Sequence, residues 1–89
     1  MGSLGITMKI MPSSPNADLE KIKEEAGKLI KKQGGKNERY SEEPIAFGLK
    51  AIIAFFELPE TANADKLEED IGKIEEVNSV QTTDMRRLL

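Results

Sequence analysis

The sequence predicts an α+β fold whose elements follow one another as β-α-β-β-α-β. Two stretches carry apolar residues at spacings of three and four, which is the period of an amphipathic helix. Four further stretches have the alternation or the composition of strands. Two of these strands are apolar and two are polar. We therefore expect the apolar pair in the middle of one antiparallel sheet and the polar pair at its edges.

The first strand is predicted by strict alternation near the N-terminus. Its apolar residues are separated by single small or polar residues, and a period of two places them on one face of a strand. These residues are Leu4, Ile6, Met8 and Ile10. Pro12 and Pro15 end the strand, because proline lacks the N–H that a sheet ladder needs.

The first helix is expected from about residue 17 to residue 32. Its apolar residues form one stripe at helical spacing. They are Leu19, Ile22, Ala26, Leu29 and Ile30. Asn16 or Asp18 is suited to cap the start of this helix. Gly34 and Gly35 supply the left-handed residue that commonly ends one.

Two strands of opposite character are expected next. Residues 37–41 read as a short polar strand, which residues 42–44 interrupt with two glutamates and a proline. Residues 49–58 form the strongest strand pattern in the chain, with apolar side chains on both faces, as in a central strand. Pro59 ends this strand for the same reason that Pro12 ends the first.

The remaining elements complete the fold. A second helix is expected from about residue 63 to residue 73, followed by a mostly polar strand over residues 80–85 and a tail over residues 86–89. Right-handed crossovers turn this element order into a ferredoxin-like sandwich, with sheet order 4-1-3-2 and both helices on one face. We expect residues 1–89 to form a single domain.

The composition narrows the possible function classes. The chain has 89 residues, a net charge of −3, no Cys and no His. Nucleic-acid binders draw on basic surfaces to neutralise phosphates, so we expect no direct contact with nucleic acid. Zinc-binding thiolates and the usual general base are missing, so we expect no enzyme, no cofactor and no metal. No apolar run approaches the ~20 residues of a membrane span, so we expect a cytoplasmic protein with no membrane contact.

Other binding functions occur on the same topology. RNA-binding modules of this fold stack bases on aromatic residues of the central strands. The first strand has no aromatic residue and the third lacks a flanking basic pattern, so this alternative and a small-molecule site rank second. Ile52 and Phe56 either lie on the open face of the sheet beside Thr7 and Lys9 or point inward. An acidic group reads as a solvated helix face, because its spacing matches no calcium loop. It consists of Glu68, Glu69, Asp70, Glu75 and Glu76.

The connection between the second and third strands is the first candidate site. Ile45 and Phe47 stand between Pro44 and Gly48, where a hairpin loop is normally polar. One interpretation is a rigid knob that projects an aromatic anchor toward a partner protein. The other is that Phe47 begins the third strand and covers the end of the core.

The C-terminal residues Arg86 and Arg87, with Leu88 beside them, are the second candidate site. Two guanidinium groups at the exit of a strand are suited to a carboxylate or a phosphate on a partner. The alternative is a solvated tail that aids solubility.

Two sequence blocks resemble archaeal translation elongation factor 1-beta. They are Pro-Ile-Ala-Phe-Gly-Leu at residues 44–49 and Thr-Asp-Met-Arg-Arg-Leu at residues 83–88. Residues 8–12 and the Ser14-Pro15 pair resemble that family too. The resemblance implies a guanine-nucleotide exchange factor that binds the GTPase elongation factor 1-alpha, releases GDP and lets GTP rebind. It would act by protein binding, as a monomer when alone.

The resemblance also implies roles for two sets of residues. In eukaryotic relatives the aromatic residue of the first block contacts the GTPase, and this residue corresponds to Phe47. A lysine beside the C-terminus of those relatives reaches the magnesium site. This chain ends without a lysine, so Arg86 or Arg87 would take that part with a planar guanidinium in place of a compact ammonium.

Overall fold

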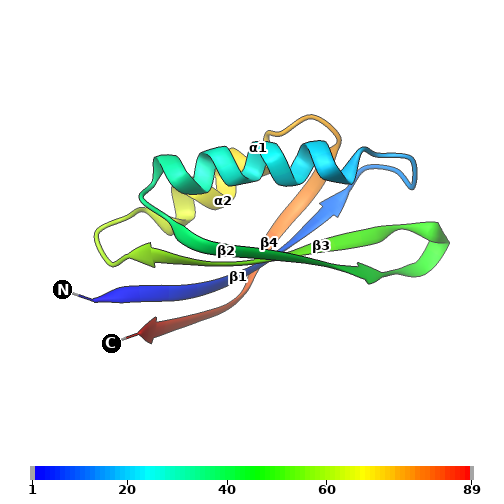
Figure 1. Ribbon diagram of the computed structural model, residues 1–89. Coiled ribbons are helices and arrows are strands. Elements are labelled where there is room, and N and C mark those ends of the chain that lie inside the picture. The colour runs from blue at the N-terminus through cyan, green and yellow to red at the C-terminus, as the bar shows by residue number, and fades with distance from the viewer. Residues whose placement is uncertain (1, 89) are drawn as a thin grey trace.

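The computed structural model describes residues 2–88, and its elements follow the predicted order (Figure 1). They are β1 (Ser3–Pro12), α1 (Leu19–Lys32), β2 (Lys36–Pro44), the 3-10 turn η1 (Ala46–Gly48), β3 (Lys50–Pro59), α2 (Ala64–Gly72) and β4 (Val77–Leu88). The four strands form one antiparallel sheet in the order β2-β3-β1-β4. This is the predicted order read from the opposite edge, and both helices cover one face of the sheet. The ferredoxin-like prediction is confirmed.

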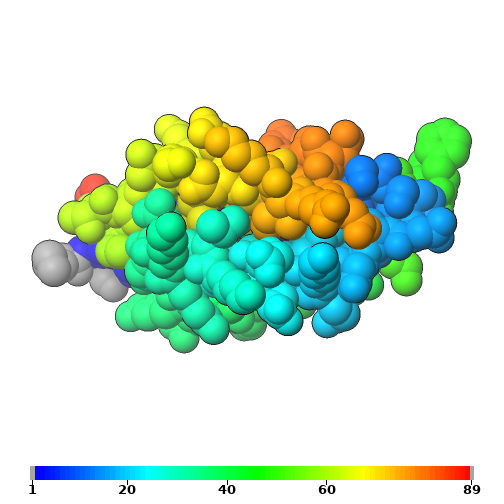
Figure 2. Space-filling view, turned by 90° about the horizontal axis from the view of Figure 1, so that it is seen from above, coloured from blue at the N-terminus to red at the C-terminus, as the bar shows by residue number. Residues whose placement is uncertain are grey.

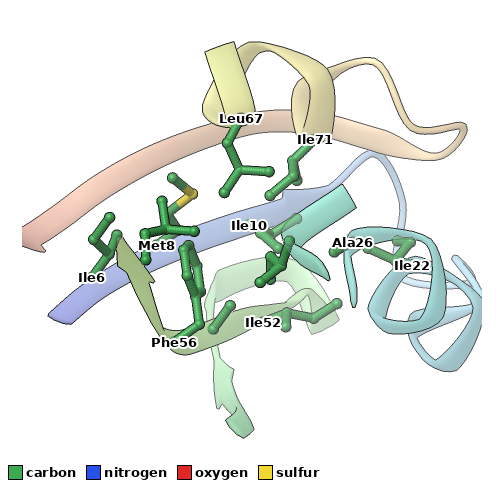
Figure 3. Close-up of a cluster of buried hydrophobic side chains, with 12 residues drawn as sticks. Ile6, Met8, Ile10, Ile22, Ala26, Ile52, Phe56, Leu67 and Ile71 are labelled. Atoms are coloured by element: carbon green, nitrogen blue, oxygen red, sulfur yellow. The ribbon is translucent and has the colours of Figure 1, made fainter. Parts of the chain in front are cut away.

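The hydrophobic core lies between the two helices and the central strands. Figure 3 shows its side chains converging from β1, β3, α1 and α2. At most 1% of the surface of each is exposed; the largest are Ile6, Met8, Ile10, Ile22, Ile30, Ile52, Phe56, Leu58, Leu67 and Ile71. Each such side chain contributes about 1.5–3 kcal/mol to folding through removal from water. Ile52 and Phe56 therefore point inward, and β3 presents Ile53 and Phe55 on the open face.

Both helices begin where a side chain caps them. The carboxylate of Asp18 accepts a hydrogen bond from the Lys21 amide at 3.2 Å, and the Asn63 side chain accepts one from the Lys66 amide at 2.9 Å. These bonds satisfy amides that have no partner inside a helix. The first helix ends before Gly34, whose φ of 87° is the left-handed conformation that the sequence predicts there.

Both edge strands are longer than the sequence suggests. The interruption expected at residues 42–44 is wrong, because β2 continues to Pro44, which pairs with Lys50. Proline is tolerated there because it is the last residue of an edge strand. The tail expected after Met85 is also wrong. Residues 86–88 belong to β4 and pair with residues 3–5 of β1. This pairing depends on hydrogen bonds to the start of β1, and a polar edge strand has no apolar pattern that would predict them.

Candidate functional site

The hairpin between β2 and β3 presents Phe47 to solvent. The Phe47 side chain is 92% exposed, whereas the other exposed large apolar residue among residues 2–88, Met85, is 48% exposed. A tight turn closes the loop, in which the Ile45 amide donates to the Leu49 carbonyl at 2.7 Å. The Phe47 side chain therefore points outward, as the first interpretation predicts, and its role as a partner anchor stays a prediction. The alternative, in which Phe47 covers the end of the core, is wrong.

The backbone of this turn is strained at the aromatic residue. Phe47 has φ 65° and ψ 26°, and Gly48 follows with φ 77°. Glycine adopts this left-handed region freely, but for a residue with a side chain it costs about 1–2 kcal/mol. Such strain persists only where the surrounding structure enforces it, and it concentrates at functional positions. The turn thus holds an aromatic ring in water at a conformational cost.

Ion pairs hold the root of the same hairpin. The Lys23 ammonium lies 2.9 Å from a Glu42 carboxylate oxygen and 3.1 Å from one of Glu20, and the Lys9 ammonium lies 3.5 Å from Glu43. The hydrogen bond from Lys23 lowers the pKa of the Glu42 carboxyl below its usual range. The same bond, with that to Glu20, raises the pKa of Lys23.

The two arginines point to opposite faces of β4. They are consecutive in a strand, where side chains alternate. The Arg86 Nε lies 2.9 Å from Asp84, and an Arg87 guanidinium nitrogen lies 3.3 Å from Glu60. Both side chains stay about three-quarters exposed, at 77% and 75%. Exposed pairs of this kind contribute little and break readily, so either guanidinium is free to contact a partner.

Leu88 has a different environment from its two neighbours. It is partly buried, and its Cδ1 would lie 3.3 Å from a Cβ added to Gly5. Leu88 therefore packs over the Gly5 backbone and fastens the end of β4 to β1. Part of the Leu88 side chain is therefore buried against β1 and is not available to a partner.

The two candidate sites lie at opposite ends of the sheet. Arg86 pairs with Gly5, which on its other side pairs with Glu57 of β3. Glu57 is seven residues beyond Lys50, where β3 leaves the hairpin, so about 23 Å of strand separates the two sites. Figure 1 shows the hairpin and the C-terminus at opposite ends of the molecule, whose longest dimension is 43 Å. The residues of each site lie together, but the two groups do not meet.

The open face of the sheet carries an arrangement that the sequence did not indicate. The Arg39 guanidinium lies 5.2 Å from the centre of the Phe55 ring, in a cation–π contact from β2 to β3. Thr7 of β1 is the neighbour of Phe55 on its other side. On the open face, the central strands β1 and β3 therefore present one aromatic ring, and the Arg39 guanidinium already covers it. The alternation along β3 could have placed Phe55 on the open face, but only once it was known that Ile52 and Phe56 point inward.

The acidic side chains on and after α2 are engaged separately. Asp70 pairs with Lys66 at 3.0 Å, and Glu69 pairs with Lys73 at 3.5 Å. Glu68 instead accepts hydrogen bonds from the amide and hydroxyl of Thr82. Within residues 2–88, no acidic side chains gather in a group able to hold a metal ion, and no helix is long and apolar enough to cross a membrane.

Tyr40, the single tyrosine of the sequence, lies against α1. Burial, aided by the negative charge of Glu38, raises the pKa of Tyr40 to about 12. Both side chains pack on Gly27 of α1, where a Cβ would lie 3.0 Å from a Glu38 carboxylate oxygen and 3.2 Å from the Tyr40 hydroxyl. The glycine therefore allows β2 to approach the helix closely.

Comparison with known proteins gives consistent matches. Residues 5–88 match the family described as the EF-1 guanine nucleotide exchange domain. A relative named elongation factor 1-beta from Methanothermobacter thermautotrophicus is 38% identical over 90 residues, covering all of both chains. A relative of the same name from Archaeoglobus fulgidus is 39% identical over 99% of this chain and 100% of its own. One from Nanoarchaeum equitans is 40% identical over 83% of this chain and 91% of its own. The chain belongs to the EF-1 guanine nucleotide exchange domain family.

Proposed function

We propose that residues 1–89 act as a single exchange domain that binds the GTPase elongation factor 1-alpha, releases its GDP and lets GTP rebind. Membership of the EF-1 guanine nucleotide exchange domain family supports the exchange function. The observation that supports the mode of binding is Phe47, an aromatic side chain kept 92% exposed by a strained turn. Aromatic residues of this kind are typical anchors of protein interfaces. The protein works by binding and makes or breaks no covalent bond.

The two ends of the sheet contact separate areas of the GTPase in this proposal. A four-stranded sheet with a packed core is stiff, so the ~23 Å between the hairpin and the arginines stays constant during docking. Phe47 fills an apolar recess at one end. Arg86 or Arg87 brings a positive charge to the nucleotide at the other end.

The arginine end supplies the step that loosens GDP. Magnesium bridges the nucleotide phosphates to a GTPase, and a fixed cation brought beside it weakens that hold. Both guanidinium groups are available for this, since their present partners are exposed carboxylates on the chain itself. Exchange also requires the domain to bind the GTPase without GDP more tightly than the GDP form, because only a difference in affinity shifts the equilibrium.

Release of a fluorescent GDP analogue from archaeal elongation factor 1-alpha tests the proposed function. The domain is added in substoichiometric amount, and the release rate is followed with and without excess GTP. We expect faster release with many GDP molecules freed per molecule of domain. An unchanged rate at every concentration would refute the exchange role. The small-molecule and RNA-binding alternatives would then be tested by ligand-induced shifts of backbone amide signals.

A further inference from the structure

The docking hairpin projects from the body of the protein. Figure 2, which looks onto the helical layer, shows the segment between β2 and β3 (green) at one extreme end of the long axis. Beyond Pro44 and Lys50 the sheet pairing stops and only the turn hydrogen bonds remain. The direction in which Phe47 points therefore depends on how firmly the root of the hairpin is held.

The root is held from both faces of β2. Glu42 and Glu43 are consecutive in the strand, so their side chains leave on opposite faces. Glu42 meets Lys23 of α1 on the helical side, and Glu43 meets Lys9 of β1 on the open side. The Lys23–Glu42 pair is the closer and the better covered, at 2.9 Å with side chains 20% and 32% exposed.

We propose that the Lys23–Glu42 ion pair, assisted by Lys9–Glu43, positions the hairpin so that Phe47 is presented in its docking orientation. This inference rests on the proposed function, because it assumes that Phe47 meets the GTPase. Neither lysine needs to touch the partner. Each acts through β2, which leads into the turn that carries Phe47.

The location of the pairs makes their effect local. β2 is an edge strand of the described sheet, whose backbone pairs with β3 alone, and the Lys23 side chain links it to the helical layer of the fold. Such pairs on the surface add little to global stability. Their loss instead makes the root of the projecting hairpin more mobile, and docking must then order it at a cost in conformational entropy. Affinity then falls while the melting temperature barely changes.

A double-mutant cycle on GTPase affinity tests this assignment. Lys23→Gln and Glu42→Gln are each expected to weaken binding about threefold, and the double variant no more than either single change. Lys23→Arg, which keeps the charge, is expected to restore most of the affinity. Lys28→Gln is the matched control, because Lys28 pairs with Glu24 and Glu25 on the same helix, away from the hairpin. It should bind normally.

Hydrogen exchange at the turn provides a readout that needs no GTPase. The Ile45 amide, which donates to Leu49, should exchange faster in Lys23→Gln and Glu42→Gln, with core amides unchanged. Lys28→Gln should leave the Ile45 amide unchanged. If the wild-type domain fails to accelerate GDP release but this amide responds as expected, the proposed function fails while the bracing of the hairpin stands.

Three results would overturn the inference. Unchanged Ile45 exchange in both variants would show that the pair does not hold the turn. Losses of affinity that multiply in the double variant would mean that Lys23 and Glu42 contact the GTPase independently. Equal losses in Lys28→Gln would indicate a general charge effect.

Discussion

Removal of the Phe47 ring is the perturbation that separates docking from folding most cleanly. The side chain is 92% exposed, so Phe47→Ala takes almost nothing out of the core. We expect a change in unfolding free energy below about 0.5 kcal/mol, which for a domain of this size moves the melting temperature by less than about 4 °C.

The loss of affinity follows from the same exposure. Because the ring lies in water in the free domain, docking can remove nearly all of it from water, and full burial of a phenylalanine is worth about 2–3 kcal/mol. Phe47→Ala should therefore weaken GTPase binding by about 30- to 150-fold. Binding is measured by titration against elongation factor 1-alpha, and stability by thermal unfolding of the same preparation.

A second variant controls for the strained backbone. Phe47→Gly removes the same ring and also relieves the left-handed conformation at φ 65°. It should lose as much affinity as Phe47→Ala and be no less stable. Normal affinity in both variants, or a fall of many degrees in their melting temperature, would refute the reasoning.

Three further changes test other parts of the structure. Replacing Arg86 and Arg87 together with Ala should slow the maximal rate of GDP release more than it weakens docking; normal maximal exchange with weaker binding would reduce the pair to steering. Gly5→Ala should displace the Leu88 side chain, which would lie 3.3 Å from the new Cβ, and lower the unfolding free energy by about 1 kcal/mol in denaturant titrations. The folded-state pKa of Glu42 is lowered by its hydrogen bond from Lys23, so its contribution to stability is complete above the ordinary glutamate pKa of about 4.3 and is lost as the pH falls through the folded-state value. Glu42→Gln should flatten that part of the stability profile in acid unfolding experiments.

The local patterns of the sequence predict the centre of the fold well. Alternation in β1, the stripes of both helices and the apolar β3 all reflect burial, which leaves a period in the chain. The bounds of the edge strands are harder to predict from the sequence, because a polar edge strand is stabilised by hydrogen bonds to its neighbour and needs no apolar period. The sequence therefore ends β2 three residues early and β4 at Met85, although pairing continues to Pro44 and Leu88.

The candidate site is predictable in identity but not in geometry. Phe47 stands out because an aromatic residue in a hairpin loop is unusual, yet its direction depends on a positive φ that no pattern reveals for a non-glycine residue. The opposite orientations of Arg86 and Arg87 follow only from their inclusion in β4. The pairs of Lys23 with Glu42 and of Lys9 with Glu43 gave no signal, since in each pair the two residues are on different elements.

Under the proposed function, the separation of the two candidate sites would give the sheet a mechanical role. An exchange factor that only held its partner would need one anchor, and the Phe47 hairpin would suffice. A charge that must reach the nucleotide at a defined place needs a second point at a constant distance from the first. β3 starts at the hairpin and β4 ends at the arginines, and β1 pairs with both along nearly its whole length. In the mechanism that we propose, the docking energy of the aromatic ring at one end would place the guanidinium at the other, and the stiffness of β1 would be part of nucleotide exchange.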